Sequence, residues 1–189
     1  MINFIKGIDI KLLLHINEKF KHDVLDRIMP RITSLGNGGI IWIIIALLFV
    51  LNGKTRTLGE MIISALILTT ILGEGIIKHV IRRSRPFFNE IEDKLLIVKP
   101  ITYSFPSGHT SSSFAAAGIL YSMQSRLAVL AFILAAVIAF SRVYLNVHYP
   151  TDVFMGIILG LFCAHLVVYA FNESFISDLN ILAAYLVHQ

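Results

Sequence analysis

Apolar residues occur along the chain in long runs that short polar segments separate. A helix that crosses the hydrocarbon core of a bilayer needs about 20 mostly apolar residues. Five runs reach or approach that length, at residues 32–52, 58–80, 107–124, 127–146 and 151–171. The pattern therefore predicts an all-α fold, a polytopic bundle of transmembrane helices.

Two weaker segments flank these runs. Residues 5–18 mix apolar and charged positions, which is typical of a helix lying in the membrane interface. Residues 176–187 are apolar but short for a complete crossing. Because either segment would be a sixth helix if it crossed partially or at a tilt, we predict five to six. The whole chain is expected to be one membrane domain, with an N-terminal interfacial or partly spanning helix, a catalytic core and a C-terminal tail helix at residues 1–24, 25–172 and 173–189.

Composition agrees with a membrane protein and argues against both a nucleic-acid partner and an intrachain disulfide. Hydrophobic residues make up 56% of the chain, and charged residues make up 15%, against about 25% in soluble domains. The mean hydropathy is +0.77. The net charge of +4 is mild and the acidic residues are interspersed with the basic ones, so we expect no nucleic-acid partner. The single cysteine, Cys163, excludes an intrachain disulfide.

Alternation of the helices brings polar residues together at one membrane face. The end of the 58–80 run and the end of the 127–146 run face the same side as the starts of 107–124 and 151–171. The chemistry-bearing residues at these ends are Lys78, Arg85, Ser107, Gly108, His109, Arg142, His148 and Asp152. Hydropathy alone therefore predicts that these residues can meet at one face of the membrane.

Basic residues near the ends of apolar runs require a reason, because charge is costly in hydrocarbon. Arginine forks onto phosphate oxygens, and lysine acts beside it as a point charge. Lys78, Arg85 and Arg142 are therefore candidates for binding an anion. For Arg82 and Arg83 we favour the alternative, in which the side chains extend to the lipid headgroups.

The segment Pro106-Ser107-Gly108-His109 opens the third run. Proline suits the first turn of a helix, and glycine permits close approach of a ligand to the backbone. The amides from Ser107 onward would be unpaired donors at the positive end of a helix, which is an anion site. An ordinary capped helix start is the alternative interpretation.

His148 and Asp152 lie four residues apart, where a carboxylate can orient an imidazole. An imidazole so oriented can attack phosphorus, and His109 can protonate the leaving oxygen. Taken alone, His148 would be an ordinary interfacial histidine. The sequence has no carboxylate cluster for Mg²⁺ and no Cys/His array for zinc, so we expect neither metal nor cofactor. The residues together predict a metal-free site for phosphoryl transfer.

Three blocks of the sequence resemble the tripartite signature of the type 2 phosphatidic acid phosphatase superfamily. Every defining position is filled at the expected spacing, and three blocks in order are a specific signal. The resemblance covers roughly residues 25–172. The blocks are Lys78…Arg85-Pro86, Pro106-Ser107-Gly108-His109 and Ser141-Arg142…His148…Asp152.

The resemblance implies a role for each matched residue. His148 would be the nucleophile that forms a phosphohistidine, and Asp152 would orient it. His109 would be the general acid for the leaving group. No metal or cofactor is implied. The phosphate-binding residues would be Lys78, Arg85, Ser107, Gly108 and Arg142.

The predicted function is that of a metal-independent, integral-membrane lipid phosphate or diphosphate phosphatase. Undecaprenyl diphosphate and phosphatidylglycerophosphate or phosphatidic acid are the substrate types that we expect. The partners would be the phosphorylated lipid and the surrounding membrane lipids. Two alternatives stay open: a lipid phosphotransferase that uses the same phosphohistidine, and a non-catalytic carrier of lipid phosphates. The sequence makes no prediction of the oligomeric state.

The predicted location is the cell membrane, which the chain would cross several times. Lys54, Arg56 and Arg126 lie in short loops opposite the site, which predicts that this opposite face is cytoplasmic. Basic residues on the site's own face weaken this marker, but the resemblance also favours an extracytoplasmic site. The loop at residues 87–104 is either an interfacial lid over the site or an ordinary solvated loop.

Overall fold

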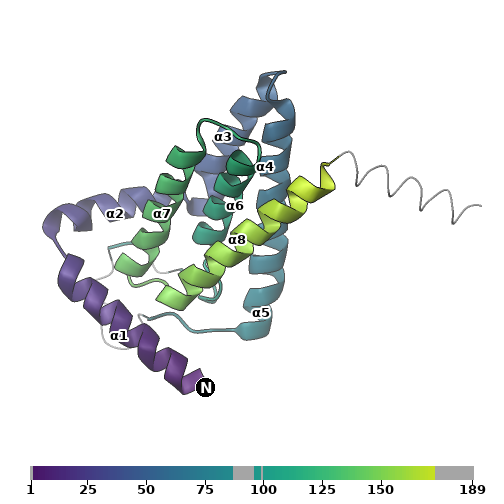
Figure 1. Cartoon of the computed structure of the whole chain (residues 1–189). Coiled ribbons are helices and arrows are strands. Elements are labelled where there is room, and N and C mark those ends of the chain that lie inside the picture. Colours follow the sequence, from purple (N-terminus) through teal and green to yellow (C-terminus); the bar gives the residue numbers. More distant parts are fainter. Residues whose placement is uncertain (1, 87–95, 99, 173–189) are drawn as a thin grey trace, which may run out of the picture.

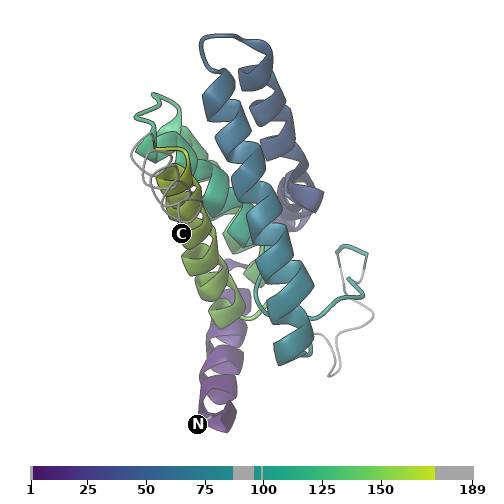
Figure 2. The same ribbon diagram turned by 90° about the vertical axis from the view of Figure 1, so that its right-hand side faces the viewer.

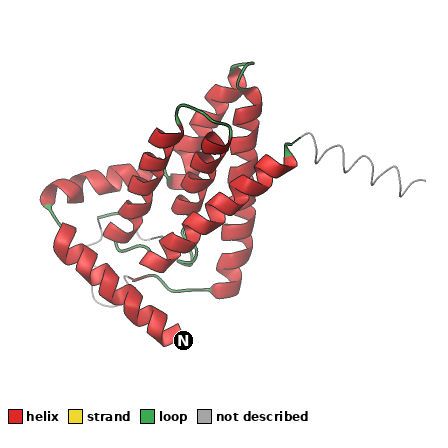
Figure 3. Ribbon diagram, in the orientation of Figure 1, coloured by secondary structure: helices red, strands yellow, loops and turns green. Residues whose placement is uncertain are grey.

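The computed structural model describes residues 2–86, 96–98 and 100–172 (Figure 1). Within these ranges every regular element is a helix, and none is a strand (Figure 3). This result confirms the predicted all-α fold. The predicted C-terminal tail helix at residues 173–189 lies outside the described part of the chain, and the predicted division of the chain at residues 24 and 172 remains a prediction.

Short connections join the elements up to α5 and from α6 onward, whereas residues 82–107 separate α5 from α6. Residues Arg56–Ile81 form one continuous rod, which consists of α4, the π-helical segment η2 and α5. In chain order the elements are α1 (Ile2–Phe20), α2 (Asp23–Leu35), η1 (Asn37–Gly39), α3 (Ile40–Leu51), α4 (Arg56–Thr69), η2 (Thr70–Ile77), α5 (Lys78–Ile81), α6 (Gly108–Ser122), α7 (Ala128–Tyr144) and α8 (Pro150–Ala170).

Helix α6 forms the centre of the bundle, packed against α8, α7 and α4. The α3–α4 hairpin stands beside α6 and α8 (Figure 2). Small residues such as Ala115 and Ala116 are fully buried on α6 and allow this close packing. The one tryptophan, Trp42, is also fully buried, and its indole N–H donates to the Ser113 hydroxyl at 2.9 Å. A hydrogen bond of this kind satisfies the polar end of an otherwise apolar side chain.

The first apolar run does not form a single straight helix. The run predicted at residues 32–52 is interrupted, because Gly38 and Gly39 adopt left-handed conformations with φ of 57° and 71°. Such angles are accessible to glycine without steric cost. As a result α2 and the segment Asn37–Leu51 meet at a bend of 46°.

In the part of the chain that the structure describes, two helices are long and apolar enough to cross a membrane, namely Arg56–Ile81 and Pro150–Ala170. The bent pair formed by α2 and Asn37–Leu51 would be a third if it counts as one span. Helix α7 is apolar but has 17 residues, and α6 has 15. The apolar helices agree with a membrane protein, while the count of five to six crossings remains a prediction.

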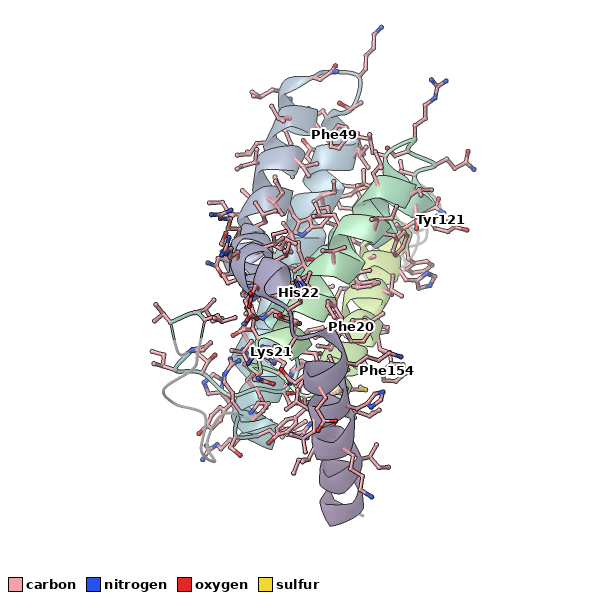
Figure 4. The ribbon with its side chains drawn as sticks, turned by 90° about the vertical axis from the view of Figure 1, so that its left-hand side faces the viewer. Phe20, Lys21, His22, Phe49, Tyr121 and Phe154 are labelled. Atoms are coloured by element: carbon pink, nitrogen blue, oxygen red, sulfur yellow. The ribbon has the colours of Figure 1, made fainter. Side chains whose placement is uncertain are left out.

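Helix α1 packs against the ends of α7 and α8 at the lower edge of the bundle in Figure 1. A corner at Lys21 and His22 turns the chain from α1 into α2 (Figure 4). The His22 ring caps α2 by accepting a hydrogen bond from the Val24 amide at 3.2 Å. The Phe20 ring packs edge-on against Phe140 of α7, with 5.7 Å between centroids. These contacts place α1 against the same end of the bundle as the predicted site.

Candidate active site

A cavity of about 880 Å³ opens at the end of the bundle that holds α5 and the start of α6. Its walls come from the corner between α2 and η1, the η2–α5 rod, the first turn of α6, the end of α7 and residues 97–98 and 100–102. Residues 87–95 and 99 of the predicted lid lie outside the described chain. Six of the eight predicted site residues line this cavity: Lys78, Arg85, Gly108, His109, Arg142 and His148.

The other two predicted residues, Ser107 and Asp152, are fully buried and bonded to each other through their backbones. The Ser107 amide donates to the Asp152 carbonyl at 3.0 Å, so it is not the free donor that the sequence suggested. Ser107 is the N-cap of α6, and Pro106 precedes it instead of occupying the first turn. The first-turn amides of α6 therefore begin with Gly108 and His109.

Arg142 is a buried cation with a donor that lacks a partner. Its side chain is 3% exposed, and its Nη1 donates to the Thr33 hydroxyl at 2.5 Å. Its Nε is one of two buried side-chain nitrogen or oxygen atoms in the described ranges that have no hydrogen-bond partner, and the residue lines the cavity. Because an unpaired buried donor is costly, this arrangement favours an anion as the occupant of the cavity.

Lys78 is paired with a carboxylate that the sequence analysis did not consider. Its Nζ lies 2.7 and 2.8 Å from the two carboxylate oxygens of Glu74, and 3.4 Å from the hydroxyl of Thr102. In the sequence, this pair is indicated only by its spacing of four residues, which places Glu74 and Lys78 on one helix face. A phosphate that binds to Lys78 must therefore compete with Glu74.

Arg85 is 4% exposed and uses all of its donors on protein groups. Its Nε donates to the Thr102 carbonyl at 2.7 Å, and Nη2 donates to the Thr102 hydroxyl and the Tyr103 carbonyl at 3.1 Å each. Its Nη1 donates to the Val147 carbonyl at 2.8 Å and lies 3.1 Å from Nε2 of His148. Burial lowers the pKa of Arg85 to about 10, which still leaves it charged at neutral pH.

The Arg85 contact determines which nitrogen of His148 carries the proton. A guanidinium can only donate, so Nε2 of His148 accepts and the proton lies on Nδ1. Nδ1 lies 3.7 Å from Oδ2 of Asp152, which is longer than a hydrogen bond. Burial, followed by the charges of Arg142 and Arg85, lowers the pKa of His148 well below its ordinary value. The imidazole is therefore neutral at physiological pH, with a lone pair on Nε2.

Asp152 is held at the first turn of α8, which begins at Pro150. Its Oδ2 accepts from the Tyr149 amide at 2.9 Å, in a capping box. Its Oδ1 accepts from Nη1 of Arg83 at 2.8 Å. The prediction that Arg83 extends to the headgroups is therefore wrong, because its guanidinium points inward to Asp152 and Asp9.

His109 faces the cavity and has one polar neighbour from the α2–α3 corner. Its Nε2 lies 2.9 Å from Oδ1 of Asn37. Neither Asn37 nor Asp9 was identified from the sequence, and no motif marks them. Among the residues that the structure describes, no group of three or more His, Cys, Asp or Glu side chains could hold a metal.

The sequence model of the PAP2 superfamily matches residues 54–176. The chain belongs to this superfamily. An undecaprenyl-diphosphatase of Sulfolobus acidocaldarius is 34% identical over 129 residues, which are 68% of this chain and 62% of that protein. The predicted family is therefore confirmed, and the matched part spans less than two thirds of this relative.

Two solved structures share the fold. The crystal structure of Aquifex aeolicus LpxE has a TM-score of 0.72 at 28% identity and covers 86% of this chain and 95% of that one. The transmembrane PAP2-type phosphatidylglycerolphosphate phosphatase of Bacillus subtilis has a TM-score of 0.73 at 26% identity, over 90% and 89% of the two chains. The similarity to the Bacillus subtilis transmembrane phosphatase supports both the predicted membrane bundle and the predicted enzyme class.

Proposed function

We propose that the protein is an integral-membrane phosphatase that releases phosphate from a lipid phosphate or diphosphate. The observation that carries this proposal is that the neutral His148, whose Nε2 accepts from Arg85, lines the same cavity as Lys78, Arg85 and Arg142. A neutral nucleophile beside several cations fits attack on an anionic phosphorus centre. The phosphatases among the relatives support the same class.

The first chemical step joins Nε2 of His148 to phosphorus and breaks the bond from phosphorus to the lipid oxygen. As the lone pair forms this bond, the N–H of Arg85 that pointed at Nε2 becomes free to donate to a phosphoryl oxygen. Arg142 contributes its unpaired Nε, and His109 gives a proton to the leaving oxygen. Water that His109 deprotonates then attacks phosphorus, releases phosphate and frees His148.

The lining of the cavity supports a substrate with an apolar tail. Val98 is 93% exposed and Ile101 is fully exposed, and both line the same cavity as the cations. In a membrane these side chains would contact lipid, while the phosphate reaches the charged interior. Undecaprenyl diphosphate, named in the archaeal relative, and phosphatidylglycerophosphate or phosphatidic acid are the substrates to test first.

We further propose that the protein crosses the cell membrane several times and opens its site to the extracytoplasmic side. The α3–α4 and α6–α7 connections lie at the end of the bundle opposite α5 (Figure 1). The exposed residues Lys54, Arg56 and Arg126 belong to or adjoin these connections, which supports a cytoplasmic location for that end. The test is labelling of intact cells with a membrane-impermeant maleimide. Ser84→Cys, at an exposed polar position next to Arg85, should react and Lys54→Cys should not; the reverse pattern would overturn the orientation.

Phosphate release by the purified protein in detergent, from a panel of lipid monophosphates and diphosphates, tests the proposed activity. His148→Ala should abolish release, whereas His165→Ala, an exposed position on α8, should leave it unchanged. Release that requires a second acceptor molecule would identify a phosphotransferase instead. Binding of lipid phosphate without any turnover would identify a carrier, and either result would overturn the proposed hydrolase.

A further inference from the structure

Helix α1 contacts the turn that carries His148 through a pair of side-chain amides. Nδ2 of Asn17 donates to Oδ1 of Asn146 at 2.6 Å, and Nδ2 of Asn146 donates back to Oδ1 of Asn17 at 3.2 Å. Asn146 has a φ of 56°, in the left-handed region that asparagine tolerates better than most residues. The first contact of α1 is thus with the turn two residues before His148.

The second contact of α1 is a fully buried carboxylate, Asp9. Its Oδ1 accepts from the Thr151 amide at 3.0 Å, and its Oδ2 accepts from the Thr151 hydroxyl at 2.6 Å. The same Oδ2 lies 2.5 Å from Nη2 of Arg83. Because a buried charge is costly unless it is paired and hydrogen-bonded, these contacts explain how Asp9 is accommodated on a helix that mixes apolar and charged positions.

Arg83 connects Asp9 to the catalytic carboxylate. Its Nη2 bonds to Asp9, while its Nη1 donates to Oδ1 of Asp152 at 2.8 Å and to the Thr151 hydroxyl at 2.7 Å. The guanidinium also lies over the Tyr149 ring, 4.1 Å from the centroid. The planar fork of arginine suits this bridge, since it can bond two carboxylates at a fixed separation.

We propose that Asp9 and Arg83 are positioning residues, which hold the Asp152 carboxylate in the orientation that directs Nδ1 of His148. This inference rests on the proposed function, because it assumes that His148 and Asp152 act as nucleophile and orienter. Asp9 lies outside the segment matched by the family model, residues 54–176, so the family signature does not contain it. Helix α1 then contributes to the geometry of the active site and is not only a helix that lies in the membrane interface.

The position of Asp152 is sensitive to this bridge. Its Oδ2 already lies 3.7 Å from Nδ1 of His148, so a small rotation decides whether the two groups interact during the reaction. A misplacement of about 1 Å can cost on the order of 100-fold in rate. We therefore expect Asp9→Asn, which keeps the shape and removes the charge, to lower kcat about tenfold. The KM should stay within about twofold, because Asp9 does not line the cavity.

The experiment measures kcat and KM for phosphate release together with the thermal midpoint in detergent. Lys11→Ala, an exposed position on the same helix, is the matched control and should change none of these three quantities. Thr151→Val is a milder variant, which removes one hydroxyl between Asp9 and Arg83. Thr151→Val should also lower kcat, by less than Asp9→Asn does, and it keeps the test valid if Asp9→Asn does not fold. Unchanged kcat in the folded variants would overturn the inference.

A double-mutant cycle separates a positioning role from general stabilisation. If Asp9 acts through Asp152, then Asp9→Asn should have no further effect on single-turnover rates in an Asp152→Asn background. An equal loss in both backgrounds would overturn the inference. Full activity of Asp152→Asn would instead contradict the proposed mechanism itself, so the two failures are distinguishable.

Discussion

A methyl group at Gly156 would enter the contact between α8 and the first turn of α6. A Cβ there would lie 2.9 Å from the Ser107 carbonyl oxygen and 2.9 Å from Cβ of Thr110. Carbon atoms in favourable contact are about 3.5–4.0 Å apart, so the two helices must separate by roughly 0.5–1 Å. Gly156→Ala should therefore strain this contact and shift the Ser107 amide from its bond to Asp152.

The expected cost of Gly156→Ala is about 1–3 kcal/mol, the usual range for overpacking a well-packed core. For a chain of this size each kcal/mol corresponds to a fall of about 2–4 °C in thermal midpoint. Displacement of the first turns of α6 and α8 by up to about 1 Å should also lower kcat by at least about tenfold. The measurements are a thermal melt in detergent and phosphate release from a lipid phosphate.

Two other glycines provide controls for Gly156→Ala. At Gly75 an added Cβ would lie 3.8 Å from the Thr70 carbonyl oxygen, an ordinary contact, so Gly75→Ala should leave both measurements nearly unchanged. At Gly160, one turn further along α8, it would meet the carbonyl of Ser111 and lie 2.9 Å from the Ala115 amide nitrogen. Gly160→Ala should lower the thermal midpoint at least as much as Gly156→Ala, with a smaller loss of kcat. A Gly156→Ala protein that melts and turns over like the parent would refute the reasoning.

Three further predictions concern charges in and beside the cavity. Glu74→Gln should make inorganic phosphate a stronger inhibitor, by about threefold to tenfold, since it removes a carboxylate that competes for Lys78; weaker inhibition would contradict this. Thr33→Val removes the hydroxyl that bonds Arg142 and should lower kcat/KM by about threefold to tenfold, measured on the same lipid. The depressed pKa of His148 means that below pH 6.5 the unfolded chain binds a proton there that the folded protein does not. As the pH is lowered below about 6.5, the free energy of unfolding should therefore decrease, by up to about 1.4 kcal/mol per pH unit. In thermal melts over the same pH range, the midpoint of His148→Gln should decrease less than that of the parent protein.

Much of the site was predictable because its markers are local. Five site residues lie close to the ends of apolar runs, and this position was enough to predict that they meet at one face of the membrane. All five line one cavity: Lys78, Arg85, His109, Arg142 and His148. Helical direction alternates along a membrane bundle, so hydropathy alone sorts the ends of the helices. The all-α fold followed from the same pattern and is observed throughout the described chain.

Hydrogen-bond partners could not be predicted in this way. Arg83 was expected at the headgroups, yet it bonds Asp9, 74 positions earlier in the chain, and Asp152, 69 positions later. Ser107 was expected to offer its amide to a ligand, yet that amide bonds the backbone of α8. These choices depend on how closely α1, α6 and α8 approach one another, which no local pattern encodes.

The sequence by itself therefore determined the helical membrane class, the family and the residues that gather at the site. Only the tertiary structure decided the state of each group: Arg142 with an unpaired Nε, Lys78 paired with Glu74, and His148 with its proton on Nδ1. The physical reason is a difference in range. Helix formation and membrane insertion depend on the periodicity and length of neighbouring residues, whereas burial and pairing of a charge depend on side chains that packing brings in from other helices.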